Sequence, residues 1–180
     1  MKKTALFFAL FLSAFTAFSQ NEPYYMTPRT VDLIDTLFPF DVSLRSPDSV
    51  ELVSNKVFKK GRVTVLAFWL TTCYPCRIEF QEYMKNWEAW KKEADFDFVA
   101  VSTDFPKNWP EFKKRKDAFP WPIVIDYNRE FGSFLPGGLN GLPQVFLYDQ
   151  NGKLVYHHRK FAMGDDKLLF DEIKKLMPPK

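Results

Sequence analysis

The sequence predicts an α/β fold in which a central mixed β-sheet carries helices on both faces. A continuous apolar, β-branched run at residues 63–69 leads directly into an amphipathic helical pattern at 73–92. A second apolar run follows at 95–102, and such alternation of strands and helices is typical of parallel strands. Residues 144–148 and 153–157 flank an Asn-Gly turn, which predicts an antiparallel hairpin. A sheet with both kinds of pairing is mixed, and its connecting helices cover both faces.

The length and charge of the chain indicate one domain that does not bind nucleic acid. A chain of 180 residues can bury a substantial core, and 20 Phe, 7 Tyr and 5 Trp supply large side chains for it. The formal net charge is 25 − 22 = +3, and without Lys2 and Lys3 it is 23 − 22 = +1. The basic run at 113–116 lies between Phe112 and Phe119 in a predicted helix. We therefore interpret it as a solvated helix face rather than a nucleic-acid patch.

Residues 1–19 have the features of a secretory signal peptide. Lys2 and Lys3 form the positive region, residues 5–18 form the apolar region, and cleavage is expected after Ser19. The apolar run is shorter than the roughly 20 residues of a membrane-spanning helix, which favours a cleaved signal over the alternative of an uncleaved N-terminal anchor. We therefore expect the protein to work in the periplasm or otherwise outside the cytoplasm.

The next stretch predicts a tether followed by an N-terminal β-hairpin. Residues 20–37 contain two prolines and are expected to form the tether, and the folded domain is expected at 38–180. Residues 40–44 alternate apolar and polar side chains, and residues 50–53 form a second short strand after a Ser-Pro-Asp-Ser turn. A helical turn is expected at 55–60, before the first strand of the central sheet.

The predicted helix at 73–92 has an apolar stripe that faces the core. Pro75 fits its first turn, where the N–H that proline lacks has no helical partner. At 100° per residue, the side chains that share the core face are Cys76, Phe80, Tyr83, Met84 and Trp87, with Trp90 at its margin. An aromatic stripe at helical spacing is typical of core packing, so it predicts no ligand site.

The second half of the chain predicts a further strand and helix unit and a closing helix. Asn108 is a candidate N-cap for a helix that ends near Ala118, because Pro110 and Glu111 fit its first turn. The remaining elements are expected as a strand at 122–126, a helix at 128–134, a loop at 136–141 and a terminal helix from Asp165 or Asp166 to Pro178.

The only two cysteines, Cys73 and Cys76, stand where the buried strand ends and the helix begins. A thiol at a helix N-terminus faces unpaired N–H groups and the positive end of the helix dipole, and both favour the thiolate that attacks disulfides. A closed zinc site needs four ligands, whereas His157 and His158 are adjacent and would point to opposite faces of a strand. A structural disulfide across so short a loop stabilises little. The pair is therefore predicted to be redox-active, with a copper site and an inert pair as the alternatives.

With these elements placed, the chain resembles the TlpA/ResA-like family of exported thiol–disulfide oxidoreductases, which have the thioredoxin fold. Residues 68–80 match the family pattern F-W-x-x-x-C-x-P-C-[KR]-x-E. Residues 141–149, with the Asn-Gly-Lys that follows, match its second signature. Residues 124–126 fit the strand and helix unit that the family inserts in the fold, and the resemblance covers nearly all of the chain after the tether.

The resemblance implies different roles for the two thiols and a role for a nearby carboxylate. Cys73 would be the exposed nucleophile and Cys76 the resolving thiol. Glu79 lies one turn beyond Cys76 at the border of the apolar face, where the family uses a glutamate to tune the site, and it would accept a proton from Cys76. A solvated helix carboxylate is the alternative for Glu79. The chain departs from thioredoxin itself in having Thr72 where thioredoxin has a tryptophan, and Ala67 where it has a buried aspartate.

The resemblance also implies where a substrate would lie. Pro143 would be a cis-proline facing the disulfide, and the backbone of Leu142 would pair with an extended substrate strand. An ordinary edge-strand proline is the alternative for Pro143. Tyr74 and Pro75, which separate the two cysteines, would contact the substrate.

The expected function is reduction of substrate disulfides by dithiol–disulfide exchange at Cys73 and Cys76, with no dissociable cofactor and no metal. Protein disulfides would be the substrates, with apocytochrome c as one candidate, and a membrane electron donor of the thiol-transport type would restore the dithiol. Two alternatives stay open: an oxidant or isomerase, which uses the same chemistry at a different potential, and a copper-binding chaperone.

Overall fold

A computed structural model describes residues 36–178, which form a single seven-stranded sheet with helices on both faces. The order of the strands across the sheet is β2-β1-β5-β4-β3-β6-β7. The β3–β4 and β4–β5 pairs are parallel, and the other four pairs are antiparallel. The strands are β1 Ser43–Arg45, β2 Glu51–Val53, β3 Thr64–Trp69, β4 Asp97–Ser102, β5 Ile123–Ile125, β6 Gln144–Tyr148 and β7 Leu154–Arg159. The predicted mixed sheet and its N-terminal hairpin are confirmed.

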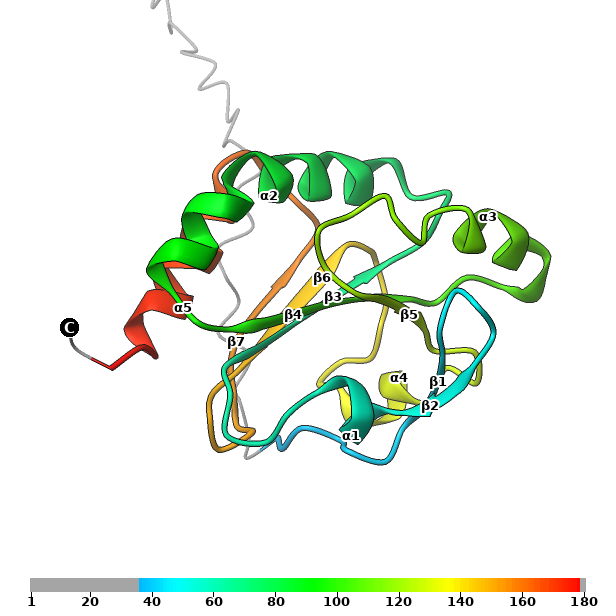
Figure 1. The fold of residues 1–180 in the computed structure, drawn as a ribbon, viewed down its shortest axis with the longest axis horizontal. Helices are drawn as coiled ribbons and strands as arrows, with labels where there is room; N and C mark the ends of the chain where they lie inside the picture. Colours follow the sequence, from blue (N-terminus) through cyan, green and yellow to red (C-terminus); the bar gives the residue numbers. More distant parts are fainter. Residues whose placement is uncertain (1–35, 179–180) are drawn as a thin grey trace, which may run out of the picture.

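The helices divide into two layers, one on each face of this sheet (Figure 1). The α-helices are α1 Ser54–Val57, α2 Tyr74–Glu93, α3 Trp109–Lys113, α4 Phe131–Phe134 and α5 Asp165–Lys175, with a short 3-10 turn η1 at Pro106–Asn108. One buried cluster joins side chains of α2, α3 and α5 to the sheet, and we call this side the α2 face. A second cluster joins α4 and the segments around α1 to the opposite side, which we call the α4 face.

Strand β3 lies in the middle of the sheet, between β4 and β6. All six of its residues are buried. Val65, Ala67 and Trp69 face one cluster, whereas Leu66 and Phe68 face the other. A strand that is covered on both faces has no polar side to present, which explains the uninterrupted apolar run in the sequence.

The long helix α2 buries a stripe that differs from the predicted one at two positions. Met84 was expected in the core, but it is 37% exposed, and Glu79 is fully buried. The prediction was wrong for Met84 because Trp90 is also buried and lies on the Glu79 side of the helix wheel. At 100° per residue, including Trp90 moves the centre of the stripe toward Glu79 and leaves Met84 outside it.

The predicted helix from Asn108 to Ala118 is shorter in the structure. Helix α3 ends at Lys113, and the chain continues in turns such as the one closed by Arg115 N donating to Phe112 O. The Asn108 side chain does not cap the helix, because its backbone is helical rather than extended, and its amide donates to Asp104 Oδ1 at 3.3 Å. Like charges three residues apart, Lys113 and Lys116, also disfavour further helix in this basic run.

The β6–β7 hairpin contains one irregularity that decides where its side chains point. Leu147 pairs with Tyr156 whereas Tyr148 pairs with Leu154, so Val155 is an extra residue in the ladder. Such a bulge changes the alternation of faces along the bulged strand. Val155 and Tyr156 consequently both pack on the α2 face. The alternation resumes after them, so that His157 points to the α4 face and His158 to the α2 face.

The predicted signal peptide and nearly all of the predicted tether lie outside the described residues. At the boundary between tether and domain, Leu37 forms an antiparallel bridge with Lys153, and Phe38 is buried among the aromatic side chains of the α4 face. Within residues 36–178, no helix combines the length and the apolar character required to cross a membrane.

Candidate active site

The two cysteines form a disulfide at the start of α2, directly after the central strand. Their Cα atoms are 5.3 Å apart. Cys73 is the N-cap of α2, and its sulfur accepts a hydrogen bond from the backbone N–H of Cys76 at 3.2 Å. Cys73 is half-buried, whereas Cys76 is completely buried in the core. The disulfide is therefore asymmetric, because only one of its sulfurs belongs to a residue that a partner can approach.

The N-terminal end of α2 provides a positive local field at Cys73. The first turn of the helix contains no acidic residue, and Pro75 occupies one of its first two positions. The free N–H groups and the helix dipole therefore act on the Cys73 sulfur without an opposing carboxylate. Tyr74 is 64% exposed, and the Arg77 guanidinium lies over its ring at 5.4 Å from the centroid. Tyr74 and Pro75 thus form an exposed surface beside Cys73.

A buried aspartate holds the loop that carries the cysteines. Asp104 accepts hydrogen bonds from the Thr71 backbone N–H and the Thr71 hydroxyl, both at 2.9 Å, and from the Ser102 hydroxyl at 2.7 Å. These bonds join the end of β4 to the connection between β3 and α2. The sequence analysis missed Asp104, although the carboxyl ends of neighbouring parallel strands meet at one edge of a sheet, and Asp104 follows β4 there.

Pro143 lies next to the same edge, and its peptide bond with Leu142 is cis. Phe68 pairs with Gln144 across the antiparallel β3–β6 ladder, so Pro143 stands beside the last residue of β3. The Pro143 carbonyl accepts a hydrogen bond from Lys160 N at 2.7 Å. Leu142 is half-buried and packs against both core clusters. The structure therefore brings Pro143 and Leu142 to the end of the sheet that carries the cysteines.

Glu79 is the most deeply buried charged group near the disulfide. Its Oε1 atom accepts a hydrogen bond from the Tyr83 hydroxyl at 3.0 Å and lies 2.9 Å from Nε2 of His158. The other ring nitrogen of His158, Nδ1, lies 3.1 Å from the Tyr156 hydroxyl. The Oε2 atom of Glu79 is buried without a hydrogen-bond partner. The solvated alternative for Glu79 is therefore wrong, because its burial is complete rather than partial.

The two tyrosines of this network stay protonated and can act as donors. Burial, and then the negative charge of Glu79, raise the pKa of Tyr83 well above its ordinary value. Burial also raises the pKa of Tyr156, with smaller contributions from Asp165 and Glu172 on α5. Both phenols consequently keep their protons at neutral pH.

His158 is the second residue that the sequence analysis missed. His157 and His158 were expected to point to opposite faces of a strand, which the structure shows, but no partner was predicted for either. The contact between His158 and Glu79 joins residues that are 79 positions apart in the chain. A signal for it existed, since a strand histidine that faces a helix meets the residues of that helix's buried stripe. That signal can be used only when the pairing register of β6 and β7 is known, because the register decides which face of the sheet His158 points to.

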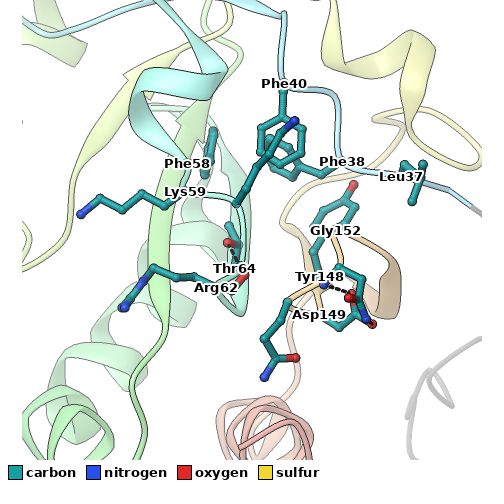
Figure 2. A pocket seen from close by; sticks show the side chains of 14 residues that line it. Leu37, Phe38, Phe40, Phe58, Lys59, Arg62, Thr64, Tyr148, Asp149 and Gly152 are labelled. Carbon is teal, nitrogen blue, oxygen red and sulfur yellow. Dashed lines mark hydrogen bonds between the residues drawn. The ribbon is translucent and has the colours of Figure 1, made fainter.

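The cavity shown in Figure 2 lies at the opposite end of β3 from the cysteines. Its volume is about 370 Å³, and aromatic side chains of the α4 face line it, among them Phe38, Phe40, Phe58 and Tyr148. None of the predicted site residues lines it. Among residues 36–178, no group of three or more His, Cys, Asp or Glu side chains is arranged to hold a metal ion.

A mixed sheet with a Cys-x-x-Cys pair at the start of its central helix defines the class of thioredoxin-like thiol–disulfide oxidoreductases. Comparison with known proteins agrees with this class. The chain belongs to the AhpC/TSA family, whose model matches residues 38–157. It is 30% identical over 186 residues to the thiol-disulfide oxidoreductase ResA of Bacillus cereus, an alignment that covers 99% of this chain and 100% of the relative. With ResA of Geobacillus thermodenitrificans it is 32% identical over 95 residues, and that alignment covers 53% of each protein.

Solved structures show the same fold. A thioredoxin-like protein from Porphyromonas gingivalis superposes with a TM-score of 0.64 at 27% identity, over 77% of this chain and 90% of that one. A putative thiol:disulfide interchange protein DsbE from Chlorobium tepidum superposes with a TM-score of 0.64 at 26% identity, over 79% of this chain and 96% of that one. The predicted thioredoxin fold and the predicted enzyme class are thus confirmed.

Proposed function

We propose that the protein is an exported reductase of protein disulfides. The observation that carries this proposal is the asymmetry of the cysteine pair. The Cys73 sulfur accepts an N–H bond at the N-terminus of α2 and belongs to a half-exposed residue, whereas Cys76 is buried. This arrangement suits one thiol for attack on another protein and the other for closing the internal disulfide.

In the proposed reaction the dithiol form starts the cycle. The Cys73 thiolate attacks one sulfur of a substrate disulfide, and the other substrate sulfur leaves as a thiolate that takes a proton from water. Cys76 then loses its thiol proton to Oε2 of Glu79 and attacks Cys73, which releases the second substrate thiolate. Two electrons pass from the cysteine pair to the substrate, and the Cys73–Cys76 disulfide remains.

The surface around Cys73 supports a protein rather than a small molecule as the substrate. Tyr74 and Pro75 are exposed on one side, and Leu142 and Pro143 border the same end of the sheet. An extended substrate segment would pair with the backbone of Leu142 and contact Tyr74 and Pro75. Apocytochrome c, whose cysteines have to be reduced before haem attachment, is a candidate substrate.

The proposed redox group is the cysteine pair itself, so the reaction requires no dissociable cofactor. A compartment outside the cytoplasm is oxidising and does not restore the dithiol. A membrane protein that carries thiol electrons outward is therefore the electron donor that this cycle needs. The signal-like leader at residues 1–19 supports the location, with an uncleaved N-terminal anchor as the alternative.

Two measurements test the proposal. A redox titration of the purified mature protein should give a potential well below that of strong disulfide donors, which have potentials of about −120 mV. A potential close to that value would instead assign the protein as an oxidant. Substrate trapping with Cys76→Ser, under conditions where Cys73 is reduced, should capture partners as mixed disulfides.

The matched control for trapping is the double variant Cys73→Ser/Cys76→Ser, which should capture nothing. If Cys76→Ser captures no more than this control, Cys73 is not the nucleophile. Tight Cu(I) binding by the wild-type protein together with absent disulfide reduction would favour the copper chaperone instead.

A further inference from the structure

We propose that His158 is a positioning residue for the resolving step, which it controls by donating a hydrogen bond to Glu79. This inference rests on the proposed function, because it concerns how Cys76 loses its proton in that reaction. It assigns a role to β7, a strand that none of the predicted site residues belongs to.

The contact between His158 and Glu79 lies in the core of the protein. Glu79 is 0% exposed and His158 is 7% exposed, so water does not replace either partner. Among the described residues, the hydrogen bonds to Glu79 come from the Tyr83 hydroxyl at 3.0 Å and His158 Nε2 at 2.9 Å, and both reach Oε1. The two donors thus fix one oxygen of the carboxylate.

The second oxygen of Glu79 remains available for the thiol. Oε2 is buried and has no partner, and Cys76 lies three residues earlier on the same buried stripe of α2. Side chains three apart on a helix are neighbours. A carboxylate whose Oε1 is held by two donors therefore has Oε2 as its free acceptor, and Cys76 is a neighbour of this carboxylate along the helix.

The direction of each hydrogen bond follows from the chemistry of the partners. An ionised carboxylate only accepts, so Nε2 of His158 carries the hydrogen that points to Glu79. The Tyr156 hydroxyl lies 3.1 Å from Nδ1, the other ring nitrogen, and this second contact holds the orientation of the ring. Tyr156 therefore orients His158, and His158 orients Glu79.

Burial determines what the loss of this donor would do. An ionised carboxylate in the core is stable only with hydrogen bonds to its charged form. Without His158, a single phenol would remain on Glu79, and the protonated form would be favoured. A protonated Glu79 has no capacity to take the proton of Cys76, so resolution would slow at neutral pH and recover only in more alkaline solution.

Other titratable groups surround the pair, and a pH-dependent measurement has to account for them. On the elements packed around Glu79 and His158 these are Cys73, Cys76 and Tyr83 on or beside α2, Tyr156, His157 and Arg159 on β7, and Asp165 and Glu172 on α5. Both tyrosines stay neutral, and the variants of Glu79 and His158 below retain His157 and Arg159, so differences between those variants report on the pair.

The resolving step can be measured alone with an aromatic disulfide as the probe. The dithiol protein attacks DTNB through Cys73 and releases one thionitrobenzoate, and the attack of Cys76 on the resulting mixed disulfide releases a second. Stopped-flow absorbance gives the rate of the second release from pH 5 to 10. The variants are His158→Leu, His158→Gln, Glu79→Gln and the double variant Glu79→Gln/His158→Leu, with His157→Gln as the neighbouring control.

We expect His158→Leu to slow the second release about tenfold at pH 7 and to move its pH profile upward by about one unit. His158→Gln retains an N–H at the position of Nε2 and should stay close to the wild type, as should His157→Gln. In the Glu79→Gln background, His158→Leu should cause no further change, because His158 acts through Glu79.

Three outcomes would overturn the proposal. The first is an unchanged pH profile in folded His158→Leu, and the second is a profile of His158→Gln that equals that of His158→Leu. The third is a further slowing by His158→Leu when Glu79 is already glutamine. A wild-type protein that never releases the second thionitrobenzoate would instead contradict the proposed function, so the two failures are distinguishable.

Discussion

His157 and His158 are neighbours in the sequence and both are buried, yet the two faces of the sheet give them different surroundings. His157 points to the α4 face, where its ring stacks on Phe146 with centroids 4.3 Å apart and its Nε2 lies 3.0 Å from Gln144 Oε1. His158 points to the α2 face and meets Glu79. Burial alone therefore does not assign a function to a histidine. The charge and the location of its hydrogen-bond partner decide what it can do.

The surroundings of His157 favour its neutral form. Burial, followed by the charges of His158 and Arg159, lowers the pKa of His157 to about 4. Its partner, Gln144, is an uncharged amide that also donates to the carbonyls of Gly138 and Asn140. We therefore assign the α4 face to stability and the α2 face to redox chemistry, and each variant below tests that division.

The largest effect is expected at the start of α2. Cys73→Ser should abolish disulfide reduction, because serine replaces the attacking sulfur, and it should leave the fold intact because Cys73 is only half-buried. An insulin reduction assay, together with circular dichroism, checks both statements. Residual reduction above that of Cys73→Ser/Cys76→Ser would show that a second group carries the chemistry.

Truncation of a core side chain on the α4 face should have the opposite effect to Cys73→Ser: it should lower stability and leave the redox chemistry intact. Phe146 is fully buried and packs edge-to-face on Phe68 as well as on His157. Phe146→Ala should lower the free energy of unfolding by about 3–5 kcal/mol. Urea denaturation measures this loss, and the rate of thionitrobenzoate release per folded molecule should stay near that of the wild type. A selective loss of that rate would break the proposed division between the faces.

Acid should destabilise the protein through His157. The unfolded histidine takes up a proton near pH 6.5, whereas the folded one has a pKa of about 4, so the unfolded chain binds more protons between these values. Stability is therefore fully present above pH 6.5 and falls as the pH drops toward 4, by up to about 3 kcal/mol.

Urea denaturation of wild type and His157→Gln at pH 7, 5 and 4 isolates this contribution from that of the carboxylates. As the pH falls, the free energy of unfolding of the wild type should decrease more than that of His157→Gln. A difference between the two that stays constant across these pH values would show that His157 does not titrate in this way.

The smallest effect is expected at the buried hydroxyl of the first residue of α1. Ser54 accepts a hydrogen bond from Val42 N at 3.1 Å and donates to Pro39 O at 2.7 Å. Ser54→Ala should cost about 1–2 kcal/mol, because Val42 N–H would lose its side-chain partner in the core. Thermal unfolding measures this cost, and Ser54→Thr is the matched control that keeps the hydroxyl. Equal melting temperatures for all three proteins would contradict the assignment.

The parts of the fold that were predictable are those specified by local sequence. The apolar run of β3, the cysteine pair at the start of α2 and the Asn-Gly hairpin each depend on residues close together in the chain. The roles expected of Glu79 and Pro143 came from family resemblance. The full burial of Glu79 was not predictable from local sequence. It depends on the rotation of α2 that buries Trp90, and on contact with His158, which lies 79 residues later in the chain.

The missed role of Asp104 has the same origin. The hydrogen bonds of Asp104 with Thr71 span 33 residues and require the β3–β4 pairing to be known. The missed Asn108 cap has a local cause instead: the backbone of Asn108 is already helical, and its amide donates to Asp104 four residues earlier.

The extra residue in β7 has a consequence for how this protein tolerates change. If the ladder continued without a bulge from Leu154, with Val155 opposite Leu147, then His157 would point toward α2 and His158 away from it. A single shift of register in the hairpin would thus exchange a stacked, uncharged neighbour for a carboxylate without altering any side chain. Insertions and deletions in this turn are consequently a greater hazard to the resolving cysteine than most substitutions of the residues that touch it.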